Sequence, residues 1–405
     1  MIGPKLRFKA FSDELSHHTL MDIIVEKPSN GIMNRQSDKV TAVKHINVID
    51  MYADDKIHVD ELSYSEYGDT AVEKCNVEIG DIFLTRSSVK ADGIAKSNIL
   101  LDDGIYVYDD HLIRLKVDKN NYIPEFVNDY LASPRFRRQF IVRAKTTAFT
   151  TIGQGDVASC TGDFPSLPEQ QKIAEFLSTI DTVIEKQKET VSAWEERKKG
   201  VMQKLFSQEV RFKADDGSEF PEWEEKKLGE VGDIMTGNTP STKQEDYYGG
   251  CYLWVTPTDI TDSREVSATA KKLTELGYTV ARHIPANSVL VTCIASIGKN
   301  AIIRENGSCN QQINSITPYN DYSVEFVYYL ICQNERLLHA NAGTGGMEIL
   351  NKDSFSKIKM SFPCLAEQQK IADCLSSLDE VIERQEATLA AWEELKKGLL
   401  QQMFV

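Results

Sequence analysis

The chain has 405 residues, 41% of them hydrophobic and 26% charged, which is typical of globular proteins and excludes a collagen-like, fibrous or mostly disordered chain. This length suggests two to four domains. Because the sequence has no run of about 18 apolar residues and no N-terminal signal segment, we expect neither a transmembrane helix nor secretion, and predict a cytoplasmic protein. The net charge of −15, taken alone, opposes nucleic-acid binding, which requires Lys and Arg to neutralise phosphates.

The eight cysteines form no CxxC pair and the seven histidines form no HExxH motif, so we expect reduced thiols and no metal site. Motifs for catalysis are missing as well. The sequence has no GxxxxGK[ST] phosphate loop and no Pro-Pro dipeptide of the kind that amino-methyltransferases use. A GxGxxA-like stretch at 153–158 lacks the acidic residue that a dinucleotide site requires. We therefore expect a chain without catalytic residues.

Two mixed α/β modules alternate with two helical segments along the chain, which predicts an α+β protein. In chain order these are 1–160 (first module), 161–208 (first helical segment), 209–360 (second module) and 361–405 (second helical segment). Runs of β-branched and apolar residues at 80–85, 112–117 and 288–292 predict strands inside the modules. Each module is long enough to bury a core of its own.

The two helical segments are copies of each other. Residues 167–206 and 365–404 align without a gap at an offset of 198, and 24 of their 40 positions are identical. Shorter copies flank them, because Arg7-Phe8-Lys9-Ala10 recurs at 211–214 and Glu125-Phe126-Val127 recurs at 325–327. This internal tandem repeat predicts pseudo-twofold symmetry between the two halves of the chain.

Apolar residues recur in both helices with alternating spacings of four and three, the period of a coiled-coil seam. We expect the helices to pair as an antiparallel coiled coil, each about 57 Å long at 1.5 Å per residue. The alternative is that each helix packs only on its own module. A glutamine at one seam position favours a fixed register, and a tryptophan is expected to anchor the seam. The predicted seam is Ile173, Leu177, Ile180, Ile184, Gln187, Val191 and Trp194 with Ile371, Leu375, Leu378, Ile382, Gln385, Leu389 and Trp392.

Several motifs resemble the conserved regions of type I restriction-modification specificity subunits. Each long helix opens with Glu-Gln-Gln-Lys-Ile-Ala and ends with Lys-Lys-Gly-x-x-Gln-x-x-Phe. Residues 211–230 look like the usual entry to a target recognition domain, and 254–260 and 310–312 add to the resemblance. The first module departs from this pattern, because no Trp-x-x-x-Lys-Leu-Gly-Glu follows Arg7-Phe8-Lys9.

The resemblance implies two target recognition domains, each reading one half of a bipartite, gapped sequence in double-stranded DNA. The helical regions would set the gap and dock two modification (methyltransferase) subunits and two restriction (motor-nuclease) subunits. S-adenosylmethionine, ATP and Mg are then expected on those partners, and no cofactor on this chain. Three alternatives remain: the specificity partner of a fused nuclease-methylase, a coiled-coil scaffold that binds no DNA, and a self-contained methyltransferase, which the missing Pro-Pro motif opposes.

Candidate DNA contacts lie in loops and in one basic cluster, where cations can bind phosphates, Arg can bind guanine and Gln can bind adenine. Structural turns, solvated helix faces and core networks remain alternative interpretations of these residues. The candidates in the first module are Arg86, Ser87, Lys90, Arg137, Arg138, Arg143, Lys145, Thr146 and Thr147. The candidates in the second module are Thr258, Ser296, Lys299, Asn310, Gln311, Gln312, Thr344 and Gly345.

None of the four segments is basic, since their net charges in chain order are −4, −1, −6 and −4. Restricted basic patches on an acidic chain can still contact DNA, because the local field matters more than the net charge. We therefore expect the lone chain to bind DNA weakly, and to bind more tightly once partner subunits close around the duplex.

Overall fold

The computed structural model describes residues 4–53, 56–343 and 348–404. The chain divides into two compact units, and each long helix contributes to both of them. Unit 1 comprises residues 1–189 and 387–405, and unit 2 comprises residues 190–386. The sequence-based division, which gave each helical segment a stretch of its own, differs from this one because each helix packs on different partners along its length.

Unit 1 contains two four-stranded sheets among its described residues, with strand orders β2-β10-β6-β8 and β3-β5-β4-β9. Its remaining strands form the three-stranded sheet β11-β12-β7 and the pair β1-β13. The strands are β1 (Ser16–Thr19), β2 (Ser29–Asn30), β3 (Gln36–Ser37), β4 (Val43–Ile46), β5 (Ser63–Ser65), β6 (Ile82–Thr85), β7 (Ser87–Ser88), β8 (Ser97–Ile99), β9 (Ile105–Tyr108), β10 (Leu112–Leu115), β11 (Lys145–Thr146), β12 (Thr150–Thr151) and β13 (Thr161–Phe164). The helices are α1 (Asp69–Cys75), α2 (Pro124–Ala132), α3 (Pro134–Arg143) and α4 (Gln154–Ala158), with short 3-10 turns at Leu20–Ile23, Val48–Tyr52 and Ala91–Gly93.

Unit 2 contains a five-stranded sheet of order β15-β22-β19-β20-β17, a three-stranded sheet of order β18-β16-β21, and the pair β14-β23. The strands are β14 (Glu224–Lys227), β15 (Gly232–Thr236), β16 (Tyr248–Val255), β17 (Glu265–Val266), β18 (Lys272–Leu273), β19 (Ser288–Thr292), β20 (Asn300–Ile303), β21 (Ser308–Cys309), β22 (Ile313–Pro318) and β23 (Lys359–Phe362). The helices are α6 (Leu228–Val231), α7 (Glu275–Val280), α8 (Val324–Gln333), α9 (Glu335–Ala340) and α10 (Lys352–Lys357), with 3-10 turns at Glu245–Tyr247 and Pro257–Asp259.

The apolar runs that predicted strands lie in the centres of the main sheets. β6 and β10 pair antiparallel in unit 1, with Leu112 opposite Thr85, and every residue of both strands is buried. In unit 2, β19 pairs antiparallel with both β20 and β22, and its five residues are also buried. Strands buried on both faces read as continuous apolar runs, which is why these runs were visible in the sequence.

The two modules share one plan although their sequences diverge. The antiparallel ladder β2-β10-β6-β8 of unit 1 matches β15-β22-β19-β20 of unit 2. The pair β1-β13, with Ser16 opposite Phe164, matches the pair β14-β23, with Glu224 opposite Phe362. Strand β1 therefore occupies the position of β14, although the first module lacks the Trp-x-x-x-Lys-Leu-Gly-Glu motif that begins just before β14. Strand pairing uses backbone groups, so it tolerates a wide range of side chains.

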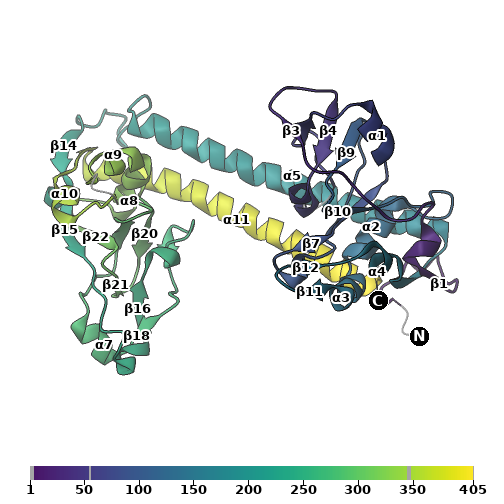
Figure 1. The fold of residues 1–405 in the computed structure, drawn as a ribbon. Coiled ribbons are helices and arrows are strands. Elements are labelled where there is room, and N and C mark those ends of the chain that lie inside the picture. Colours follow the sequence, from purple (N-terminus) through teal and green to yellow (C-terminus); the bar gives the residue numbers. More distant parts are fainter. Residues whose placement is uncertain (1–3, 54–55, 344–347, 405) are drawn as a thin grey trace. The chain divides into compact units, whose positions relative to one another are not determined.

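The two predicted long helices are confirmed as α5 (Leu167–Phe206) and α11 (Leu365–Met403), each unbroken (Figure 1). All fourteen predicted seam residues are buried or half-buried. None of the helices in the described ranges is long and apolar enough to cross a membrane.

The helices run antiparallel within each unit. In unit 1, Lys396 of α11 pairs with Asp181 of α5 at an Nζ–Oδ1 distance of 2.5 Å. In unit 2, Lys198 of α5 pairs with Asp379 of α11. Residues 181 and 379 lie at the repeat offset of 198, as do 198 and 396, so the two ion pairs are equivalent. In unit 1, Lys188 of α5 also pairs with Glu393 of α11, so the α11 partner number falls as the α5 number rises, which requires opposite chain directions.

Each helix also packs against a module, so the helices pair as predicted, and the alternative that each helix packs only on its own module is wrong. The seam residues Ile173, Leu177 and Ile180 join the main core of unit 1, which Trp392 of α11 also contacts. In unit 2, Ile371 and Leu375 join the core of the second module together with Leu205 of α5. The first half of each helix thus packs on its own module and on the second half of the other helix.

The helix ends complete the module cores with aromatic side chains. Phe404 stacks on Tyr130 in unit 1, with ring centroids 5.1 Å apart and an interplanar angle of 22°. Phe206 packs against Phe326 in unit 2 at a centroid distance of 5.5 Å. Such aromatic pairs contribute about 0.5–1.5 kcal/mol beyond the area they bury, so each module depends on the terminal residues of a helix.

The Glu-Gln-Gln motif fastens the start of each helix to its module. Glu169 is 1% exposed and accepts two 2.7 Å hydrogen bonds from the Arg7 guanidinium. Glu367 is fully buried and accepts bonds of 3.1 and 2.9 Å from Arg211. The two repeated sequences Arg-Phe-Lys and Glu-Gln-Gln are therefore the two sides of one bidentate ion pair, which we call the clasp.

The first glutamine of the motif supports the clasp by bonding backbone groups. Gln170 Nε2 donates to the Pro165 carbonyl at 2.9 Å, and its Oε1 accepts from the Ile123 N–H at 3.1 Å. Gln368 repeats both contacts with the Pro363 carbonyl and the Ser323 N–H, each at 2.9 Å. Because both glutamines are 1% exposed, these bonds satisfy polar groups that would otherwise be buried without a partner.

We expect Glu367→Gln to destabilise unit 2, because it leaves the Arg211 guanidinium beside a neutral group. Removal of one partner from a buried ion pair lowers the free energy of unfolding by about 3–5 kcal/mol. Because Arg211 is partly exposed, we expect a loss of about 3 kcal/mol here. Urea denaturation of the full chain, followed by tryptophan fluorescence, measures the change in midpoint. The control is Gln369→Ala, an exposed residue of the same helix turn. Equal midpoints for the two variants contradict the structural role of the clasp.

A carboxyl group with a raised pKa lies beside the unit 1 ion pair. Asp129 of α2 is half-buried in a groove that Asp181 and Lys396 also line. Burial raises the pKa of Asp129 to about 7, an effect that the Lys396 ammonium opposes and the carboxylates of Asp181 and Glu125 reinforce. The folded state therefore keeps a proton on Asp129 at pH values where the unfolded chain has lost it.

We expect the stability of unit 1 to fall as the pH rises from about 4 to about 7, and Asp129→Asn to reduce that fall. In this window unfolding releases the Asp129 proton, so the free energy of unfolding decreases with pH, by at most about 4 kcal/mol for three pKa units. Urea midpoints at a series of pH values measure the slope. Asp38→Asn, at an exposed carboxyl of the same unit, is the control. Parallel pH profiles for wild type and Asp129→Asn would rule out this assignment.

Candidate nucleic-acid interface

Two predicted loops of the first module meet in one small sheet, β11-β12-β7 (Figure 1). Thr150 pairs with Ser88 of β7 on one side and with Thr146 of β11 on the other. The Ile152 N–H donates to the Arg86 carbonyl at 3.0 Å and extends this ladder. The candidates Arg86, Ser87 and Lys90 therefore share a surface with Lys145, Thr146 and Thr147. We call residues 86–90 and 145–151 the hairpin surface.

The hairpin surface is basic in an acidic chain. Arg86, Lys90 and Lys145 are exposed, and neither of its two segments contains Asp or Glu. Thr146 and Thr147 are exposed beside them and offer hydroxyl groups that can donate or accept hydrogen bonds. Cations flanking short polar side chains are the combination that contacts phosphates and base edges.

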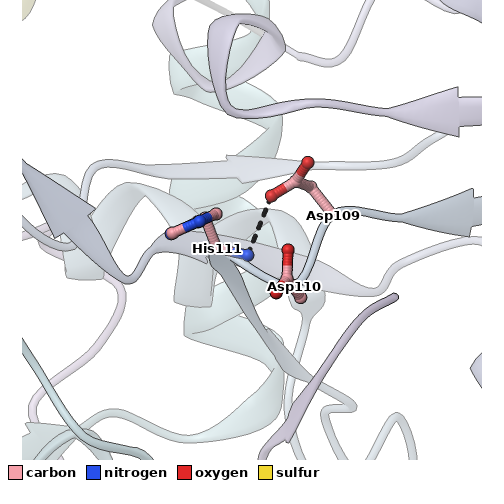
Figure 2. Close-up of side chains that lie close together, drawn as sticks. All are labelled: Asp109, Asp110 and His111. Atoms are coloured by element: carbon pink, nitrogen blue, oxygen red, sulfur yellow. Dashed lines mark hydrogen bonds between the residues drawn. The ribbon is translucent and has the colours of Figure 1, made fainter. Parts of the chain in front are cut away.

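The turn between β9 and β10 lies against this surface. Figure 2 shows Asp109, Asp110 and His111, whose possible ligand atoms all lie within 4.8 Å of one another. Asp109 Oδ1 accepts the His111 N–H at 2.8 Å, so the turn itself explains why the three are close (Figure 2). His111 Nδ1 lies 3.0 Å from Ser87 Oγ, and Arg86 donates to the Asp110 carbonyl at 3.4 Å. His111 thus adjoins the hairpin surface, and no motif in the sequence indicated it.

The predicted basic cluster, Arg137, Arg138 and Arg143 of α3, divides into structural and exposed cations. Arg137 binds the backbone carbonyls of Asp92 and Ile94, and burial lowers its pKa. Arg143 is half-buried and donates to the Gln139 carbonyl at 3.4 Å, whereas Arg138 is exposed. The guanidinium of Arg137 therefore binds backbone groups within the first module, so the proposed DNA interface does not include Arg137.

Backbone hydrogen bonds join the loops that carry described candidates of the second module. The Cys293 N–H donates to the Gln312 carbonyl at 2.8 Å, and the Leu350 N–H donates to the Cys293 carbonyl at 2.9 Å. The Asn310 N–H bonds the carbonyl of Val255, at the end of the strand that precedes Thr258. Thr258, Ser296, Lys299 and Gln311 are exposed, whereas Thr344 and Gly345 lie outside the described residues.

Asn310 and Gln312 bond each other. Asn310 is 7% exposed, its Oδ1 accepts the Gln312 N–H at 2.9 Å, and its Nδ2 donates to Gln312 Oε1 at 3.0 Å. Gln311 points outward and accepts a 2.6 Å bond from the Thr239 hydroxyl. The Asn-Gln-Gln segment is thus a turn held by its first residue, with Gln311 as its exposed side chain.

Equivalent backbone bonds frame the two candidate surfaces. The bonds from Arg86 N–H to the His111 carbonyl and from Ile152 N–H to the Arg86 carbonyl correspond to those around Cys293. Arg86 therefore corresponds to Cys293, and His111 to Gln312. The two modules thus share a backbone frame but carry different side chains on it, and Arg86 is exposed whereas Cys293 is buried.

Comparison with known proteins places both halves of the chain in one family. The model of the "Type I restriction modification DNA specificity domain" matches residues 30–192 and again residues 221–391. This chain belongs to that family. The two matches cover both modules and most of both long helices, so the specificity-domain chain is a tandem pair, as the internal repeat indicated.

Relatives of this specificity-domain chain carry matching names. It is 31% identical over 211 residues to the type I restriction enzyme MjaIX specificity subunit of Methanocaldococcus jannaschii, over 49% of this chain and 48% of the relative. It is 33% identical over 147 residues to the HindI specificity subunit of Haemophilus influenzae, over 35% and 32%. The chain thus spans half or less of the length of these two relatives. A putative MjaX specificity subunit of M. jannaschii matches at 25% identity over 93% of this chain and 90% of the relative.

Two solved structures share the fold of the specificity-domain chain. The type I restriction-modification S subunit of M. genitalium matches with a TM-score of 0.59 and 14% identity, over 100% of this chain and 99% of that one. A chain from a structure of type I R-M complex assembly and conformational transition matches with a TM-score of 0.56 and 16% identity, over 97% and 98%. These likenesses extend over both modules and both helices.

We expect Arg137→Ala and Arg138→Ala to separate structural from surface cations. Arg137→Ala leaves two backbone carbonyls of the specificity-domain chain without their charged donor, which costs about 1–3 kcal/mol and lowers the urea midpoint. Arg138→Ala removes an exposed side chain and should leave that midpoint within about 0.5 kcal/mol. Equal losses of stability would contradict the division of the cluster.

Proposed function

We propose that this chain is the non-catalytic, DNA-recognition subunit of a cytoplasmic type I restriction-modification system. The observation that carries the proposal is the family match to both halves of the chain. Relatives that match about half and nearly all of the chain are named specificity subunits, which supports the same role. The candidate surface of the first module, an exposed basic hairpin in an acidic chain, is consistent with a reader of DNA.

We propose further that each module reads one half of a bipartite target with a gap between the halves. Sequence is read by side chains at base edges, whereas phosphate contacts fix position. The two modules share a backbone frame but differ at the exposed Arg86 and the buried Cys293, and at the exposed His111 and the half-buried Gln312. Different side chains on one frame predict two different half-sites, and the paired helices are proposed to set the gap.

The partners in this proposal are two modification subunits and two restriction subunits. S-adenosylmethionine, ATP and Mg would act on those subunits, and this chain would hold none of them. A relative in fold comes from a structure described as complex assembly of the type I R-M system, which supports partnership without fixing the number of copies. A fused nuclease-methylase partner is the variant that stays open.

The acidic chain is expected to need these partners for tight DNA binding. Three exposed cations on the hairpin surface release few counterions, so the lone chain should show weak, salt-sensitive binding. A gel shift of the chain with and without its modification subunits checks this expectation. Tight sequence-specific binding by the lone chain would contradict it.

Methylation mapping tests the proposed function. Cells that express the chain with its modification partner are expected to carry methylated adenine in one bipartite, gapped motif. Replacing 209–360 with the corresponding module of another family member should change one half-site and leave the other unchanged. No motif, or the same motif after the swap, would refute sequence reading and favour the scaffold alternative that the net charge of −15 suggests.

At residue level we expect Lys145→Ala to weaken DNA binding by the complex without changing the methylated motif. Loss of one phosphate contact should reduce the slope of log affinity against log salt by about 1. Lys39→Ala, at an exposed lysine outside the hairpin surface, is the matched control. An unchanged salt slope for Lys145→Ala would remove the hairpin surface from the interface.

A further inference from the structure

The hairpin surface ends in two exposed apolar side chains. Phe149, between β11 and β12, exposes 56% of its surface, and Val89, after β7, exposes 80%. Because Ser88 pairs with Thr150 in an antiparallel register, Val89 and Phe149 leave the sheet at the same end. Phenylalanine is among the residue types most often buried, and here Phe149 and Val89 together form a small exposed apolar patch on a polar surface.

The base of the hairpin is fixed. The Thr147 N–H donates to the Phe149 carbonyl at 3.0 Å and closes the tip, and the Thr146 and Thr150 hydroxyl oxygens lie 3.1 Å apart. Thr150 and Ile152 are each 2% exposed, and Ile152 belongs to the main core of unit 1. The buried strand residues thus present Phe149 on a firm support, as a contact residue requires.

The surroundings of Phe149 suit a nucleic acid. Arg86, Lys90 and Lys145 are exposed on the same surface, and its two segments contain no carboxylate. A two-stranded β-ribbon fits the major groove of B-DNA, where flanking cations can reach the phosphates. In that groove the C5-methyl group of thymine is the apolar group that a base pair presents, and Phe is one of the side chains that contacts it.

We propose that Phe149, supported by Val89, recognises the C5-methyl group of a thymine in the half-site read by the first module. The inference rests on the proposed function and adds a specificity contact to it. The exposed threonines at 146 and 147 would then face neighbouring base edges, and the three cations would hold the phosphates on either side. The contact is apolar, so it distinguishes thymine from a base pair without a methyl group at that position.

The test replaces each thymine of the mapped half-site, one at a time, with uracil, which removes only the methyl group. DNA binding is measured with the full complex that contains the modification subunits. For the wild-type chain one uracil substitution is expected to weaken binding ~4-fold, the worth of one buried methyl group. The same substitution should have no effect with Phe149→Ala. Phe149→Leu, which keeps an apolar group, should retain sensitivity.

The control variant is Val40→Ala, at a residue that is 80% exposed in the same unit but lies outside the hairpin surface. It should respond to uracil as the wild type does. The inference is overturned if the half-site has no thymine, if wild type tolerates every uracil, or if Phe149→Ala stays sensitive. Equal weakening of all duplexes by Phe149→Ala would indicate a general wedge between bases. Loss of the modification subunits from the complex would indicate a protein contact, and both results overturn the inference.

The failure of the proposed function has a different signature. If the wild-type complex methylates no defined motif, the chain is not a sequence reader and the thymine contact falls with that role. If the wild-type complex methylates a motif but uracil and Phe149 show no coupling, only the thymine contact is refuted.

Discussion

A buried carboxylate at the start of each long helix is the constraint on which the rest of the structure depends. Glu169 and Glu367 lie out of water, where an unpaired charge costs several kcal/mol, so each requires the arginine near the start of its module. The ion pair joins residues more than 150 positions apart and encloses a whole module between them. It also fixes the first turn of the helix, and the direction of that turn determines which seam residues face the module core.

The repeat and the helices could be predicted from sequence because their signals are periodic or duplicated. The strands β6, β10 and β19 were visible for a similar reason, since both of their faces are buried. The division of α5 and α11 between two compact units could not be predicted. The apolar stripe of each helix contacts one module near its start and the other module near its end, and the period of the stripe is the same in both places.

The candidate site was predictable residue by residue but not as a surface. Residues 86–90 and 145–151 meet only because β12 pairs on both sides, and two-residue strands leave no hydrophobic period in the sequence. The sequence could not distinguish the structural Arg137 from the exposed Arg138. A position on a helix does not show that the backbone carbonyls of Asp92 and Ile94 lie within reach of one arginine. Exposed Phe149 was missed because an isolated aromatic residue is usually part of a core.

The fastening of the last turns of α11 to unit 1 has a consequence for damage to the chain. Leu399, Leu400, Met403 and Phe404 pack with the first module, and the Gln402 carbonyl accepts a 3.1 Å bond from the Leu6 N–H. A premature stop near residue 390 would therefore remove core side chains from unit 1, most of which is translated first, and leave the core of unit 2 intact. During translation, the first module must wait for nearly the entire chain to emerge before its core is closed.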